Sequence, residues 1–371
     1  MKTGATIEER EGESMKVDRP STLYVLSPKH LFVINILGNS IGSCSVKKLR
    51  NPFAGMIELE SRILLVGGKA PHVPDYLYYS PSYNIARKEI FEVKQGSWSI
   101  VPSKIMPSMN EGKKHPIVQK FGTKVFVLHM GSRFVYDRTR GRYSTKVFEL
   151  FDFACPEKGW VVKSVPFFDG SPSGWYRVVD FLRIGEKLYL LIALDYCGEC
   201  CYVFNLKTEE WSEDDPFFWR MGCPPIDLGL PVGAVSAPGL DDETYVVFGF
   251  FDYFLRFGAA LFTEGKGCSC YQKVDGIFNL EGLRRKRMAC QFVEMGNGDY
   301  LGLLTAQDEK TFHQYLLVSI FSLEVLAAQV PPNPSLDKPI ETTFLSVNRK
   351  NQHKFNIRGA PFSYFAGAVC L

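Results

Sequence analysis

The stretch LLVGGKAPHVPDYLYYSPSYNIARKEIFEVKQGSW, from Leu64 to Trp98, decides the fold of this chain. An apolar run ends in Gly67-Gly68, a tyrosine-rich segment follows, and an alternating stretch then leads to Trp98. Alternation of apolar and polar residues over a few positions predicts a β-strand. The stretch therefore reads as strands joined by a long loop, and the fold depends on whether this unit repeats.

A polar turn followed by a strongly apolar run recurs along the chain. Neighbouring runs start 55 to 63 residues apart, at Ile63, Val125, Leu188, Tyr245 and Tyr300. Each copy continues with a variable loop, an alternating strand and an anchor residue, and a weaker strand precedes each run. The anchors are Trp98, Trp160, Trp211, Tyr271 and, in the fifth copy, Val330. Such regular spacing indicates a repeat architecture.

Four short strands per repeat predict a β-propeller, in which four-stranded blades pack face to face around an axis. The five copies cover about residues 54–332. Strands expected within 22–50, together with one or two in the tail HKFNIRGAPFSYFAGAVCL, make a sixth blade from both ends of the chain and remove free strand edges. We therefore expect an all-β fold, a single six-bladed propeller over residues 21–371, after a polar, disordered tail over residues 1–20.

The composition excludes several classes of protein. The 371 residues carry a formal charge of only +3, which gives no electrostatic case for nucleic acid binding. No apolar run is long enough to span a membrane, and the first residues lack the apolar core of a secretory signal. The ten cysteines therefore read as reduced thiols, and we expect a monomer in the cytoplasm, the nucleus or both.

The order of an apolar strand, Gly67-Gly68 and a tryptophan 30 residues later resembles a kelch repeat. The sequences of the copies, such as KLYLLIALDYCGECCYVFNLKTEEW, resemble those of the kelch propellers of plants, many of which follow an F-box. The double glycine is kept only in this copy, and the repeats exceed the usual length of about 50 residues. About 20 polar residues precede the first strand, too few for an F-box, so we expect a free-standing propeller.

Some plant kelch propellers are iron-dependent specifier proteins, and that resemblance implies a Glu-x3-Asp-x3-His motif. None of the six histidines has an aspartate four positions before it and a glutamate eight positions before it. Cys197, Cys200 and Cys201, with Cys268 and Cys270 in the next copy, favour reduced thiols over a zinc site, because no histidine lies near them in sequence. We expect neither a metal nor another cofactor.

In a kelch-type blade the loops between the second and third strands share one rim with the inter-blade loops, and loops on a rigid scaffold usually carry function. These loops are rich in tyrosine and arginine, the residue types enriched at binding hot spots. Some of these aromatic residues would simply pack loop against loop. The candidate binding residues are Tyr79, Arg133, Tyr136, Arg138, Asp195, Tyr196, Asp252, Tyr253, Arg256, Gln307 and His313.

Two patterns sharpen this set. Asp195, Asp252 and Gln307 each stand seven positions into an apolar run, so they could form an arc of acceptors at the mouth of the channel, or cap their own turns. In the segment YDRTRGRY, Arg138, Arg140 and Arg142 alternate, which would place them on one face of an extended arm that could hold a carboxylate or phosphate.

The basic run at residues 284–287 reads as a solvated linker or as a nuclear-import or anion patch.

Two functions stay open. The first is a binding module that presents the aromatic and arginine-bearing rim to a protein or peptide. The second is a binding or catalytic pocket for an aromatic or cationic small metabolite of plant specialised metabolism, in which tyrosine and aspartate could act as acid and base. No sequence pattern brings a Ser-His-Asp triad together, and we expect a binding protein rather than an enzyme.

Overall fold

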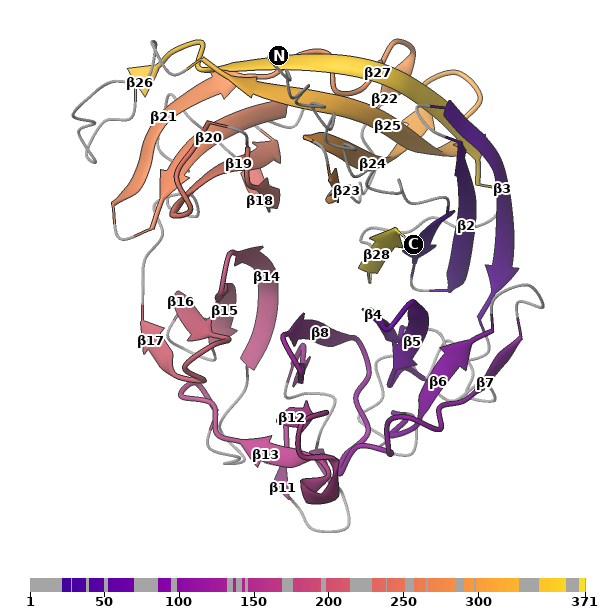
Figure 1. Cartoon of the computed structure of the whole chain (residues 1–371), viewed down its shortest axis with the longest axis vertical. Coiled ribbons are helices and arrows are strands. Elements are labelled where there is room, and N and C mark those ends of the chain that lie inside the picture. Colours follow the sequence, from indigo (N-terminus) through magenta and orange to yellow (C-terminus); the bar gives the residue numbers. More distant parts are fainter. Residues whose placement is uncertain are drawn as a thin grey trace, which may run out of the picture.

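The computed structural model is a closed ring of six blades (Figure 1). It describes residues 22–27, 29–37, 40–49, 53–69, 86–94, 99–131, 136–137, 142–143, 146–168, 176–194, 198–213, 229–237, 239–250, 257–264, 266–284, 290–296, 298–326, 340–357 and 367–370. Helix within these ranges is limited to one 3-10 turn, η4 (Pro156–Lys158). The prediction of an all-β propeller with six four-stranded antiparallel blades is confirmed.

The blades are numbered here in chain order, and the strands of each run from the axis outward. Blade I is β28 (Gly367–Cys370), β1 (Thr22–Leu26), β2 (His30–Leu37) and β3 (Ser40–Lys48). Blade II is β4 (Gly55–Leu59), β5 (Arg62–Val66), β6 (Ile90–Val93) and β7 (Ile100–Pro102). Blade III is β8 (Pro116–Phe121), β9 (Lys124–His129), β12 (Phe148–Asp152) and β13 (Val161–Lys163).

The second half of the ring follows the same order. Blade IV is β14 (Tyr176–Ile184), β15 (Lys187–Leu194), β16 (Gly198–Asn205) and β17 (Trp211–Glu213). Blade V is β18 (Gly229–Val235), β19 (Thr244–Phe250), β20 (Phe257–Thr263) and β21 (Gly267–Lys273). Blade VI is β23 (Cys290–Gly296), β24 (Asp299–Asp308), β25 (Gln314–Val325) and β27 (Leu345–Asn356), with the short β22 (Leu283–Arg284) also paired to β24.

The second strand of each blade is the apolar run that recurs in the sequence. In β5, β9 and β24 nearly every residue is buried on both faces. A strand that is covered on both faces by neighbouring blades loses the alternation of a half-exposed strand and becomes continuously apolar. This is why these runs were the clearest signal of the repeat.

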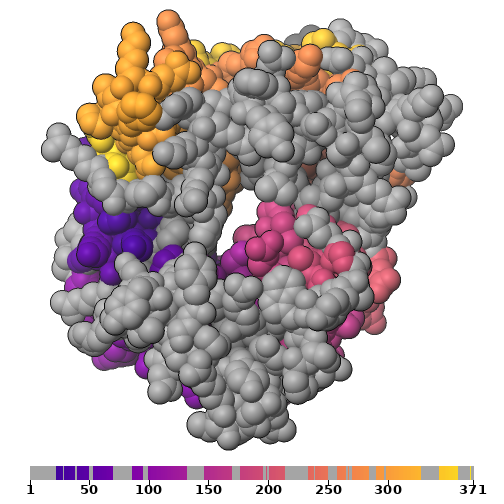
Figure 2. All heavy atoms as spheres, turned by 180° about the vertical axis from the view of Figure 1, so that it is seen from behind, coloured from indigo at the N-terminus to yellow at the C-terminus, as the bar shows by residue number. Residues whose placement is uncertain are grey.

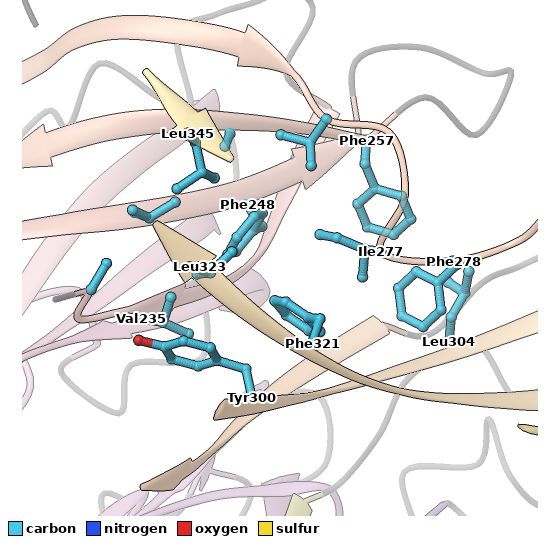
Figure 3. Packing of buried hydrophobic residues seen from close by; sticks show 14 of the residues in the cluster. Val235, Phe248, Phe257, Ile277, Phe278, Tyr300, Leu304, Phe321, Leu323 and Leu345 are labelled. Atoms are coloured by element: carbon cyan, nitrogen blue, oxygen red, sulfur yellow. The ribbon is translucent and has the colours of Figure 1, made fainter. Parts of the chain in front are cut away.

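The hydrophobic core is divided among the contacts between blades. Six clusters of buried side chains occur among the described residues, and each joins two neighbouring blades. The cluster between blades V and VI is shown in Figure 3, where Phe248, Tyr300 and Phe321 point toward one another from β19, β24 and β25. The rings of Tyr300 and Phe321 stack with centroids 5.7 Å apart. Side-chain packing between blades therefore holds the ring together.

The predicted anchors fill these inter-blade cores where the structure describes them. Trp160 packs on Phe151 at 5.4 Å in the cluster between blades II and III, and Tyr271 is buried between blades IV and V. Both described indoles also bind the linker that enters their own blade. Trp160 donates to the carbonyl of Pro107 at 2.8 Å, and Trp211 donates to that of Ser164 at 3.1 Å. Trp98 and Val330 lie outside the described residues.

Blade I is closed by strands from both ends of the chain, as predicted. β28 pairs antiparallel with β1, and Leu23 lies opposite Cys370. The C-terminal tail contributes one strand to this blade rather than two. Its first residues, HKFN, end β27 and belong to blade VI.

The prediction that the fifth copy ends near residue 332 was therefore wrong. The outer strand of blade VI is β27, which follows a long connection over residues 326–344. Within this connection β26 (Ile340–Glu341) leaves blade VI and pairs parallel with β21 of blade V. The connection carried the apolar signal at Val330, whereas β27 is largely exposed and polar.

The antiparallel strand order gives the ring two different edges. One edge, here called the turn rim, carries tight turns between first and second strands, such as Glu60-Ser61, Gly122-Thr123 and Gly185-Glu186, and also the connections between third and fourth strands, among them 326–344. The opposite edge, here called the loop rim, carries the inter-blade linkers and the connections between second and third strands. These connections are residues 27–29, 67–89, 130–147, 195–197, 251–256 and 309–313.

The described part of the chain contains no helix that is long and apolar enough to cross a membrane.

Candidate functional site: the loop rim

The candidate binding residues predicted from the sequence belong to the connections of the loop rim, except Gln307, which lies near the loop-rim end of β24. Most of them lie outside the described residues, so their arrangement stays a prediction. These are Tyr79, Arg133, Arg138, Asp195, Tyr196, Asp252, Tyr253 and Arg256. The structure describes the backbone of Tyr136, and it describes Gln307 and His313 with their side chains.

The connection of blade III contains a small hairpin. β10 (Tyr136–Asp137) pairs with β11 (Arg142–Tyr143), so that Tyr136 faces Tyr143 across the two strands. Arg142 therefore belongs to the returning strand. The expectation of one extended arm with alternating arginines is wrong at this point, because the chain reverses between Asp137 and Arg142.

Gln307 and His313 lie on either side of the turn that joins β24 to β25 in blade VI. The Gln307 side chain is 6% exposed, and its Nε2 donates to the carbonyl of Phe312 at 2.8 Å. Its Oε1 is buried and has no hydrogen-bond partner. His313 is exposed on the rim, and its carbonyl accepts the N–H of Asp308 at 2.9 Å. Gln307 thus braces the turn, and the predicted arc with Asp195 and Asp252 stays a prediction.

Asp308 fixes the conformation of this turn. Its Oδ1 accepts the backbone N–H groups of Lys310 at 3.0 Å and Thr311 at 2.8 Å. The bond from Thr311 lowers the pKa of the Asp308 carboxyl below its usual range, because the hydrogen bonds favour the charged form. An aspartate that bonds the backbone two and three residues onward is a common turn-forming element. The consecutive residues Phe312 and His313 of this turn are both exposed.

Sequence reasoning did not single out Phe312. It is 55% exposed, and its backbone has the left-handed φ of 60°. The sequence QDEKTFH contains the aspartate that predicts a turn, but no pattern in it shows that the phenylalanine would face the solvent.

A buried ion pair supports the loop rim between blades II and III. Lys113 and Glu149 both have fully buried side chains and form an ion pair. Glu149 also accepts the N–H of Asn110 at 2.9 Å and that of Glu111 at 3.1 Å. Lys113 donates as well to the carbonyl of Lys146 at 3.1 Å. A buried charge needs such a set of partners, so this pair fixes the linker over residues 103–115 onto blade III.

Two histidines next to this pair are held neutral. Burial, followed by the charge of Lys113, lowers the pKa of His129 well below its usual value. The N–H groups of Gly131 and Lys114 lie 3.2 and 3.3 Å from its two ring nitrogens. Burial, followed by the charge of Lys114, lowers the pKa of His115 to about 3.

Lys114 itself is buried. Burial and the neighbouring charge of Lys69 lower its pKa to about 8. The loop rim thus combines exposed side chains at blade VI with buried polar groups at blades II and III, here called the foundation: the Lys113–Glu149 pair, the two neutral histidines and Lys114. These groups fix backbone segments in place, and their hydrogen bonds are made within the fold.

Across the described part of the chain, no group of three or more histidine, cysteine, aspartate or glutamate side chains is placed to hold a metal ion. The ring has an opening at its centre, which is visible in the space-filling view from the side opposite to Figure 1 (Figure 2). A ligand-binding function for this opening stays a prediction.

No protein-family model matches the chain, and no curated protein is detectably similar to it. The β-propeller class therefore rests on the architecture alone. Propellers are commonly scaffolds for protein interaction, because their loops vary without disturbing the blades.

Proposed function

We propose that this protein is an interaction module that binds a protein or peptide partner through the loop rim. The observation that carries the proposal is the difference between the two edges of the ring. On the turn rim most first and second strands are joined by two-residue turns, and the one long connection between described strands is 326–344, whereas on the loop rim the connections 67–89 and 130–147 are both long. Long connections on a rigid scaffold add surface without contributing to the blades, which is typical of binding loops.

The foundation of the loop rim supports the same function. The Lys113–Glu149 pair and the indole bonds of Trp160 and Trp211 hold the linkers to the blades. A surface that is ordered before binding loses less conformational entropy when a partner arrives. The foundation therefore favours a preorganised recognition surface.

We further propose that the chain is a kelch-type propeller of plant origin, located in the cytoplasm or nucleus. The support is the order of the second strand β5, Gly67-Gly68 and a tryptophan before the outer strand, together with the reduced state that the cysteine content predicts.

Site-specific photo-cross-linking tests the binding proposal. A benzophenone amino acid is placed at Lys29 or Lys310 on the loop rim, and at Lys207 or Lys266 on the turn rim, all of which are exposed. After irradiation in an extract of the source tissue, we expect the same cross-linked protein from both loop-rim positions and none from the turn-rim positions. Equal cross-linking from both edges would contradict the proposal. Native mass spectra with a retained small molecule, and no rim-dependent cross-links, would favour the metabolite pocket instead.

A further inference from the structure

Phe312 is an exposed aromatic side chain in a tight turn of the loop rim. With 55% of its surface exposed, it is the one aromatic side chain among the exposed large hydrophobic residues of the described part of the chain. Isolated exposed apolar residues are common on protein surfaces and need no explanation by themselves. Phe312 differs from them because the fold accepts two unfavourable features in order to hold it there.

The first unfavourable feature is the backbone of Phe312. Its φ of 60° lies in the left-handed region, which costs a residue with a bulky side chain roughly 1 kcal/mol or more. Glycine or asparagine would adopt this conformation with less strain. The turn therefore contains a phenylalanine at a position where glycine or asparagine would cost less conformational strain.

The second unfavourable feature is the amide of Gln307. Its Nε2 is bound to the Phe312 carbonyl, which fixes the orientation of the amide and leaves the buried Oε1 without a partner. An unsatisfied buried acceptor destabilises a fold, and such groups are rare in native structures. The brace on Phe312 is thus kept although it leaves a polar atom unsatisfied.

The turn is also tied down on its other sides. The Asp308 carboxylate binds the N–H groups of Lys310 and Thr311, and the N–H of Phe312 donates to the Asp308 carbonyl at 3.1 Å. The N–H of Glu309 donates to the carbonyl of Gly282 at 3.1 Å, which connects the turn to the linker entering blade VI. The conformation that exposes Phe312 is therefore over-determined by its surroundings, as strained functional residues usually are.

We propose that Phe312 is the anchor residue of an interaction surface, and that it inserts into an apolar pocket of a peptide or protein partner. This inference rests on the proposed function of the loop rim and adds the residue and the chemistry of contact. Aromatic residues including phenylalanine are enriched in the cores of interfaces, a few buried anchors carry most of the binding energy, and a preorganised backbone lowers the entropic cost of binding. The exposed neighbours Glu309 and Lys310 carry opposite charges, so the partner that fits is an apolar, weakly charged segment rather than a polyanion or polycation.

Peptide selection followed by one substitution tests the inference. A phage-displayed library of random 12-residue peptides is selected on the wild-type protein, and the bound peptides are mapped by hydrogen exchange. The key variant is Phe312→Gly, because glycine keeps the left-handed turn while the ring is lost. We expect its melting temperature to stay within a few degrees of that of the wild type, because relief of the backbone strain offsets the greater freedom of glycine in the unfolded chain. The affinity for loop-rim peptides should fall by about tenfold or more, as for a hot-spot residue.

Two further variants complete the test. Phe312→Tyr keeps the ring and should retain most of the affinity. Glu60→Gly removes the same kind of backbone strain, at φ 49° in a turn-rim turn, and should leave peptide affinity unchanged.

The outcomes separate this inference from the proposed function. Peptides that protect the loop rim but bind Phe312→Gly as tightly as the wild type would overturn the anchor and leave the binding function standing. Peptides that never protect the loop rim, or a selection that yields none, would contradict both. Loss of affinity with an unchanged or raised melting temperature supports the anchor, since unfolding cannot explain it.

Discussion

At the scale of single residues, Gly67 shows why one copy of the repeat keeps its double glycine. Its φ is 68°, and a Cβ built there would lie 2.5 Å from the carbonyl oxygen of Lys113. That carbonyl also accepts the N–H of Gly68 at 2.8 Å, so neither backbone segment can move away freely. The linker into blade III approaches blade II more closely here than any side chain allows.

We therefore predict that Gly67→Ala destabilises the protein much more than Gly122→Ala. Both glycines have a positive φ, but nothing lies within 4 Å of a Cβ at Gly122. The backbone strain of about 1 kcal/mol is common to both variants, and the steric clash should add roughly 2 kcal/mol at Gly67 alone. Free energies of unfolding from urea titrations check this. An equal loss of unfolding free energy in both variants would show that the linker at Lys113 shifts to make room for the added methyl group.

A second prediction at this scale concerns acid stability. His115 and His129 remain neutral in the fold because their pKa values are lowered, whereas in the unfolded chain a histidine has a pKa of about 6.5. Below that pH the unfolded state binds more protons than the folded state, so the free energy of unfolding must decrease as the pH falls from 7 to 5. One such histidine accounts for about 2 kcal/mol at pH 5.

The variant His115→Asn tests the source of this loss. Asparagine tolerates the left-handed φ of 54° at this position and does not titrate. Its free energy of unfolding should therefore fall less steeply than that of the wild type between pH 7 and 5, by up to half. An unchanged slope in chemical denaturation at several pH values would assign the acid sensitivity to other groups.

At the scale of elements, the sequence predicted strands best where burial is complete. The runs that begin at Ile63, Val125 and Tyr300 became β5, β9 and β24, because a second strand packs against blades on both sides. β27 was not predicted as an outer strand, since its side chains are mostly exposed and its sequence carries no apolar periodicity. The exposed position of Phe312 was not predicted for a related reason. Asp308 indicated a turn, but whether a turn residue is exposed depends on the tertiary fold.

The strand on which ring closure depends most is β28. Its four residues pair with β1, and Ala368 packs against the core between blades VI and I. We predict that removing residues 367–371 lowers the melting temperature by roughly 5 °C or more, in one cooperative transition, because several ladder bonds and their packing are lost together. A chain that lacks residues 1–10 is the control and should melt as the full chain does. An unchanged melting temperature after loss of β28 would show that the ring does not need its fourth strand in blade I.

At the scale of the whole molecule, each described inter-blade cluster joins two neighbours, including blades VI and I. In these clusters the described residues of each blade are covered by residues of its neighbours, so the blades stabilise one another around the ring. Blade I differs from the others in one respect, which is that no turn connects its first and second strands. The first and last strands of the described chain meet here, where Leu23 lies opposite Cys370.

This arrangement predicts that the position of the chain ends can be moved to another blade. A permuted chain would join residue 371 to Thr22 through an Asn-Gly turn and would begin at Thr123 and end at Gly122, in the first–second turn of blade III. β8 and β9 would then close blade III as β28 and β1 close blade I in the natural order. We expect one cooperative melting transition within about 5 °C of the original, because every inter-blade core is retained. Separate transitions for two groups of blades, or a chain that does not fold, would show that blade I must be the closing blade and that the six interfaces are not equivalent in holding the ring.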